Sequence, residues 1–140
     1  MMGNRAYRAA DGRPLALEGV LARHPRLRVY IMHAGYPYAD ELISLLQLYP
    51  QVYVGVGVIA WATPRPAFHR FLKQLVDAGF AQRVMFGSDQ MVWPEAIEET
   101  IDAIDTADFL SESQKRAIFY ENARRFLRLE VPPEALGDDA

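Results

Sequence analysis

The stretch RVMFGSDQMVWPEAI, from Arg83 to Ile97, sets out the pattern that organises the whole chain. Its first part, Arg83 to Asp89, is an apolar run with β-forming residues, bounded by a glycine and a serine, which is typical of a buried strand. Asp89 stands where this strand ends. Pro94 then suits the first turn of a helix, because its φ angle is already fixed near the helical value. The stretch therefore predicts a strand, a polar loop with one carboxylate, and a covering helix.

Two earlier apolar runs, Leu27 to Gly35 and Val52 to Ile59, have the same character. Their hydrophobicity is nearly continuous, as expected for strands that are covered on both faces of a parallel sheet. Helical patterns at Tyr38 to Tyr49 and Pro66 to Phe80 lie between the three runs, and each is long enough for a parallel crossover. Such crossovers are almost always right-handed. We therefore predict an α/β fold with three parallel strands.

The helices are expected to pack through apolar stripes at helical spacing. In the first two crossover helices the expected inward residues are Leu42, Leu45, Leu46, Phe68, Leu72, Leu75 and Val76. In the helix from Pro94 to about Ala107 they are Ile97, Ile101 and Ile104, and in the last helix Phe119, Ala123, Phe126 and Leu127. Gly79 is expected to end the second crossover helix.

Ser111 and Gln114 form a predicted capping box that opens the last helix, and Pro14 to Pro25 predicts one further helix. The resulting domain organisation is a flexible N-terminus at residues 1–13, a domain at residues 14–129, and an acidic tail at residues 130–140.

The chain of 140 residues suits a single domain, and its net charge of −3 comes from scattered rather than clustered charges. This pattern indicates no nucleic-acid partner. There is no cysteine, which excludes disulfides, thiolate ligands and a cysteine nucleophile. No apolar run approaches the roughly 20 residues that cross a bilayer, and the N-terminus does not resemble a signal peptide. We expect a cytoplasmic protein without a membrane partner.

Functional side chains in parallel α/β folds collect beyond the carboxyl ends of the strands. The residues at these ends are His33, Tyr36, Trp61, Arg65, Asp89 and Trp93. Asp89 has two readings of about equal weight, a turn former or a carboxylate placed for chemistry, and His33 at an equivalent strand end favours the second. His24 and His69 do not follow strands, and we expect them to be structural or solvated.

Three segments together resemble a known family: HPRLRVYIMHAGYP (24–37), RVMFGSDQMVWPEAI (83–97) and QKRAIFYENARRFLRL (114–129). They are similar to the C-terminal part of the amidohydrolase-related metal-dependent hydrolases, in the branch of aminocarboxymuconate-semialdehyde decarboxylase. The resemblance extends from about Pro14 to Leu129. It implies a partial (β/α)8 barrel, in which the three strands are equivalent to strands six to eight, and a divalent metal, usually zinc, at the strand ends.

The resemblance also implies roles for the strand-end residues. His33 matches the histidine that binds the metal or orients the metal-activated water, and Asp89 matches the aspartate that is both metal ligand and general base. Trp61 and Arg65 would face the substrate, with Tyr36 and Trp93 beside them. Arg65 has two readings: it recognises a carboxylate on the small-molecule substrate, or it is a surface arginine, which is the commoner case after a strand.

The family site also uses a His-x-His pair and a strand-five histidine, which this sequence lacks. Catalytic zinc usually has three protein ligands, and His33 and Asp89 supply at most two. The sequence therefore leaves two alternatives open. It is the C-terminal portion of a metal-dependent hydrolase or decarboxylase, or it is a non-catalytic barrel remnant or one half of a split or oligomeric assembly.

Three strands leave two open sheet edges, which favour pairing with another chain. We expect a homo-oligomer or a complementing N-terminal barrel segment. A small open-sheet binding domain is disfavoured, because no glycine-rich phosphate loop follows any strand.

Overall fold

The computed structural model describes residues 8–91 and 93–130. Its centre is one sheet of three short strands, β1 (Val29–Ile31), β2 (Val52–Gly55) and β3 (Val84–Met85), in the order β1-β2-β3. Both strand pairs are parallel. The predicted α/β fold with three parallel strands and flanking helices is thus confirmed. The strands are shorter than predicted, because the chain turns out of the sheet well before the ends of the apolar runs.

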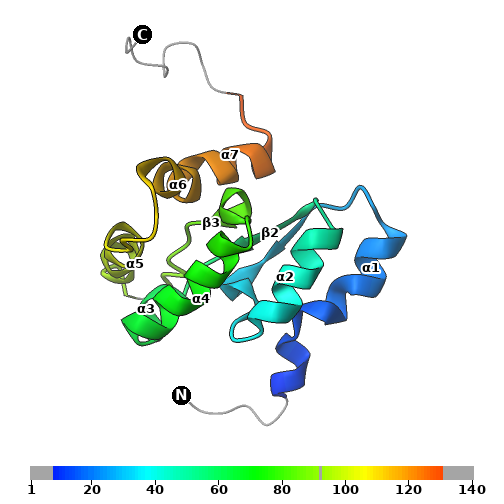
Figure 1. The fold of residues 1–140 in the computed structure, drawn as a ribbon, viewed down its shortest axis with the longest axis horizontal. Coiled ribbons are helices and arrows are strands. Elements are labelled where there is room, and N and C mark those ends of the chain that lie inside the picture. The colour runs from blue at the N-terminus through cyan, green and yellow to red at the C-terminus, as the bar shows by residue number, and fades with distance from the viewer. Residues whose placement is uncertain (1–7, 92, 131–140) are drawn as a thin grey trace.

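Helices and tight turns connect the strands and extend the chain at both ends (Figure 1). The α-helices are α1 (Glu18–Arg23), α2 (Ala39–Leu48), α3 (Ile59–Ala62), α4 (Arg65–Asp77), α5 (Ala96–Asp105), α6 (Glu112–Arg116) and α7 (Asn122–Leu127). The 3-10 turns are η1 (Ala9–Gly12), η2 (Pro14–Leu17), η3 (Met32–Gly35) and η4 (Ala81–Arg83), and η5 (Ala117–Glu121) is π-helical. The single turn of α3 was not predicted.

The two crossover helices α2 and α4 lie side by side over one face of the sheet (Figure 1). Alternation along the strands points Val52, Val54 and Val84 toward them, and all three are fully buried. The predicted inward residues of α2 and α4 are also buried, except Val76, which is partly buried at the margin of the core. Gly79 follows α4 with a φ of +88°, as expected of a glycine that ends a helix.

The opposite face of the sheet carries Tyr30 and Tyr53, which are paired in the register of β1 and β2. Phe126 of α7 packs on both rings, with centroid distances of 6.1 Å and 5.3 Å. We call this the tyrosine face. It is covered much less than the opposite face, since Tyr30 keeps 37% of its surface exposed.

The expected inner face of α5 was wrong for two of its three isoleucines. Ile97 and Ile101 are 41% and 43% exposed, and only Ile104 is buried. The buried stripe consists of Ala96, Thr100, Ala103 and Ile104. Small side chains on this stripe let α5 approach α3 closely. The close packing stabilises the fold more than burying Ile97 and Ile101 would, so these two side chains stay at the surface.

The last helix begins with the predicted capping box, in which Ser111 N donates to Gln114 Oε1 at 2.9 Å and Gln114 N donates to Ser111 Oγ at 3.2 Å. It is not one regular helix, however, because the π-helical segment η5 inserts between α6 and α7. A π turn shifts the phase of the following residues. Leu127, expected inside, is therefore 56% exposed, while the polar Asn122 is fully buried.

The predicted helix at residues 14–25 starts as the 3-10 turn η2 and continues as α1 up to Arg23. The Arg13 guanidinium ties this region to α2, since its Nε donates to Glu41 Oε1 at 2.6 Å. This contact lowers the pKa of the Glu41 carboxyl. Of the predicted flexible N-terminus and acidic tail, residues 1–7 and 131–140 lie outside the described residues.

Candidate active site

The carboxyl ends of the three strands are marked by an unusual backbone. His33, Ala34, Val58 and Asp89 all adopt positive φ angles, of 56°, 49°, 60° and 52°. Residues other than glycine rarely adopt this conformation, and such residues concentrate at functional sites. In the described residues the only other case is Arg128, which ends α7. The sharp turns bring side chains from all three strand ends to one edge of the sheet.

His33 and Asp89 meet at this edge, although 56 positions separate them in the sequence. His33 Nε2 lies 3.9 Å from Asp89 Oδ2, and the two side chains are 40% and 29% exposed. His33 Nδ1 lies 2.9 Å from the Gly57 carbonyl oxygen. Because that oxygen can only accept, neutral His33 carries its proton on Nδ1 and leaves the Nε2 lone pair directed at the space beside Asp89.

A small hollow of about 60 Å³ opens between these two residues. Its lining residues are Tyr30, Met32, His33, Gly57, Gly87 and Asp89. The glycines are required for this geometry. A Cβ atom on Gly57 would lie 3.2 Å from Asp89 Cβ and 3.2 Å from the Gly87 carbonyl oxygen. Larger residues there would push the Asp89 loop away from His33.

A second hollow of about 230 Å³ adjoins the first, and Asp89 lines both. Its walls include Trp61 and Trp93, whose rings pack edge to face at 5.4 Å between centroids. Trp61 Nε1 donates to the Ser88 carbonyl oxygen at 2.7 Å, which fixes the indole next to the Asp89 loop. The two tryptophans therefore form an apolar wall beside the carboxylate.

The other two predicted substrate residues have partners elsewhere. The Tyr36 ring packs edge to face on Phe71 of α4, with 5.1 Å between centroids. Arg65 Nη1 donates to Asp102 Oδ2 of α5 at 2.8 Å and to Oγ1 of Thr106, the residue that follows α5, at 3.0 Å. These contacts join α4 to α5 and do not point the guanidinium at Asp89. A substrate role for Tyr36 or Arg65 stays a prediction.

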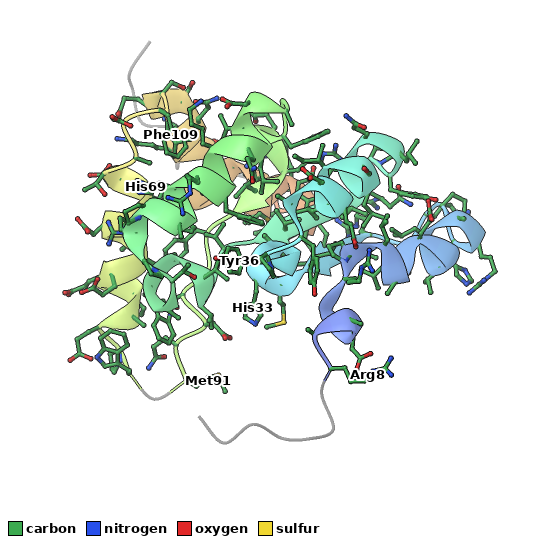
Figure 2. All side chains as sticks on the ribbon, turned by 60° about the horizontal axis from the view of Figure 1, so that its bottom comes forward. Arg8, His33, Tyr36, His69, Met91 and Phe109 are labelled. Atoms are coloured by element: carbon green, nitrogen blue, oxygen red, sulfur yellow. The ribbon has the colours of Figure 1, made fainter. Side chains whose placement is uncertain are left out.

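The remaining histidines lie away from this edge, in agreement with their expected structural or solvated character. Figure 2 shows His33 at the rim of the molecule, on the same side as Met91, and His69 on the far side beside Phe109. His69 Nε2 lies 2.8 Å from the Ala103 carbonyl oxygen and so links α4 to α5. His24 is exposed at the end of α1, beside a wide hollow at the amino end of β1.

Imidazole and carboxylate are a common ligand set for zinc and related divalent metals, and the free His33 Nε2 lone pair suits that role. The described residues nevertheless contain no group of three histidine, cysteine, aspartate or glutamate side chains that could hold a metal ion. His33 and Asp89 thus fit two positions of a metal site and do not make a whole one.

Sequence reasoning missed Tyr30 as a residue of this site. The alternating glycines of the VGVGV segment at residues 54–58 were the available signal, because they leave space on the tyrosine face of β2. Tyr30 fills that space. Its register partner is Tyr53, which places the phenol beside Gly55.

The fold and the strand-end pair define an α/β protein with its candidate site at the carboxyl ends of three parallel strands. The family model described as amidohydrolase matches residues 2–129, and the chain belongs to the amidohydrolase family.

The chain is also similar to protein fluG of Emericella nidulans, with 25% identity over 150 residues. That match covers 96% of this chain and 17% of the fungal protein, so the chain spans about a sixth of its relative. Separately, none of the helices in residues 8–91 and 93–130 has the length and apolar character needed to span a membrane.

Proposed function

We propose that this chain is the C-terminal portion of a metal-dependent hydrolase that acts on a small substrate at the strand-end edge. The observation that carries this proposal is the approach of His33 Nε2 to Asp89 Oδ2 from the two outer strands of the sheet. Two glycine-dependent loops and four residues with positive φ angles at the strand ends maintain that approach. An Asp89 that only formed a turn would require neither these glycines nor these backbone conformations.

In the proposed reaction Asp89 accepts the proton of the attacking water. Nδ1 of His33 stays hydrogen-bonded to the Gly57 carbonyl, so Nε2 remains directed at the reacting group. A divalent metal bound at this edge would lower the pKa of water and polarise the substrate carbonyl. His33 and Asp89 would supply two of its ligands, and zinc suits this donor pair.

The substrate is proposed to have an apolar or planar part. The hollow walled by Trp61 and Trp93 adjoins Asp89, and its volume of about 230 Å³ fits a group of roughly the size of an aromatic ring with a short substituent. An unsaturated acid that loses carbon dioxide at the same site, as in the aminocarboxymuconate-semialdehyde decarboxylase branch, is the finer alternative. On that reading β1, β2 and β3 correspond to barrel strands six to eight.

A second candidate function follows from the number of metal-ligating side chains at this site. Since the described residues offer no group of three, the site is proposed to become complete only with donors from elsewhere. A complementing N-terminal barrel segment is one source, and a second copy of this chain is another. A remnant without catalysis would keep the same fold and would lack turnover.

Turnover of small aryl esters and aryl amides in the presence of Zn²⁺, Mn²⁺ or Co²⁺ tests the hydrolase proposal. Asp89→Asn should lower the metal-dependent rate by about 10²-fold or more, because a general base is lost. Asp77→Asn is the matched control, since Asp77 pairs with Lys73 on the surface of α4 and should leave the rate unchanged. Equal rates in Asp89→Asn and the parent protein would refute the proposed base, and absence of turnover with every metal would favour the remnant.

A further inference from the structure

Tyr30 lies in the middle of the candidate site, yet neither the motifs of the sequence nor the strand-end positions point to it. Its side chain lines the small hollow together with His33 and Asp89. It also lines a third hollow, of about 240 Å³, on the tyrosine face next to Phe126 and Leu127. The phenol is thus the boundary between the polar strand-end hollow and an apolar hollow below it.

Three glycines make room for this phenol and hold it in place. A Cβ atom on Gly55 would lie 1.7 Å from Tyr30 Oη, and one on Gly87 would lie 3.3 Å from the same oxygen. Gly57 borders the hollow from the next position on the same face. Any side chain at Gly55 would therefore force the hydroxyl away from the strand ends. Phe126 packs against the ring from the other side, at 6.1 Å between centroids.

The Tyr30 hydroxyl can donate a hydrogen bond to a ligand. Burial raises the pKa of the Tyr30 phenol, and the nearby Asp89 carboxylate raises it further. No hydrogen bond to a described residue contributes to that shift. A tyrosine phenol carries its proton at neutral pH, and this proton can be donated to a molecule in the hollow.

We propose that Tyr30 is a ligand-binding residue whose hydroxyl donates a hydrogen bond to the carbonyl oxygen of a ligand that places its apolar part against Trp61 and Trp93. The inference rests on the proposed function for the nature of the carbonyl compound. It assigns the site to aromatic carboxamides and related carbonyl compounds. The carbonyl group points to Tyr30 and the ring lies in the tryptophan hollow.

The chain provides its own reporter for a test. Its two tryptophans, Trp61 and Trp93, both line the hollow beside Asp89, so tryptophan fluorescence reports on this site alone. Benzamide is the probe, and toluene is the comparison that lacks a carbonyl. Both are titrated into the full chain with EDTA present, so that no metal takes part.

Tyr30→Phe should raise the Kd for benzamide about threefold to tenfold, which corresponds to one neutral hydrogen bond, and should leave toluene binding unchanged. Tyr53→Phe is the matched control, because Tyr53 lies on the same face and packs on the same Phe126 ring at 5.3 Å. It should bind both probes as the parent protein does.

Equal benzamide affinities of Tyr30→Phe and the parent protein would overturn the inference, and so would a parent protein whose fluorescence shows no saturable response to benzamide. Turnover with metal is measured separately on the same variants. A protein that shows the benzamide effect without turnover retains the Tyr30 assignment and loses the proposed hydrolase function. A protein that shows turnover without the benzamide effect retains the proposed hydrolase function and loses the Tyr30 assignment.

Discussion

At the scale of single residues, the candidate site depends on glycines, which leave space for their neighbours, as much as on His33 and Asp89. His33 and Asp89 could be found in the sequence, because each ends an apolar run. The distance of 3.9 Å between His33 Nε2 and Asp89 Oδ2 could not be predicted from the sequence, since it results from positive φ angles that L-amino acids seldom adopt. Tyr30 was hidden for a related reason. Its importance depends on which neighbouring strand positions are glycine, and that is a matter of register.

Gly55→Ala tests this dependence. The new methyl group meets Tyr30 Oη at 1.7 Å and Cζ at 2.3 Å, so we expect a loss of about 1–3 kcal/mol in the free energy of unfolding. Chemical denaturation measures it.

In the double variant Gly55→Ala/Tyr30→Ala the clash is gone, so the cost of Gly55→Ala should shrink markedly in that background. Additive costs in the two backgrounds would show that Gly55 and Tyr30 do not interact as described.

At the scale of elements, hydrophobic periodicity predicted α2 and α4 well, because each buries one broad apolar stripe, and it located the three strands but made them too long. It failed where packing follows size or backbone irregularity. The small residues of α5 are buried in preference to Ile97 and Ile101, and the π-helical segment η5 rotates α7 away from its expected phase. Neither effect has a signature in a list of apolar positions.

Asn122 holds this irregular region to the sheet. Its Nδ2 donates to the carbonyl oxygens of Ala81 at 2.8 Å and Val84 at 2.6 Å, and the residue is fully buried. Asn122→Ala leaves both acceptors without that donor and should lower the free energy of unfolding by about 1–3 kcal/mol.

Asn122→Asp should lower stability more at neutral pH, since a carboxylate would face two carbonyl oxygens. Gln47→Ala, at an exposed position of α2, is the control and should change stability by less than about 0.5 kcal/mol. An unchanged free energy of unfolding in both Asn122 variants would show that α7 is held by its apolar contacts alone.

At the scale of the whole molecule, the two faces of the sheet are unequal. One is sealed by α2 and α4, and the other is left with the hollow between Tyr30, Met85 and Phe126. Leu127 and Leu129 extend this apolar area, at 56% and 54% exposure. Apolar areas of this kind mark contact sites with other chains.

Self-association should therefore depend on the tyrosine face. Leu127→Glu should reduce the mass measured by light scattering at high protein concentration, because it places a charge at the edge of this face. Leu48→Glu is the control, as Leu48 is 67% exposed on α2, across the sheet. A parent protein that is monomeric at high concentration, or an equal effect of both variants, would contradict the prediction.

In the proposed function His33 and Asp89 act together as ligands of one metal ion. Side-chain NMR of the three histidines during a titration with Co²⁺ tests it most directly, because the paramagnetic ion broadens only nearby signals and His24 and His69 serve as internal controls. We expect the His33 resonances to broaden first, at the lowest Co²⁺ concentrations, and Asp89→Asn to abolish this preference. Uniform broadening of all three histidines, or preferential broadening of His33 that persists in Asp89→Asn, would contradict it.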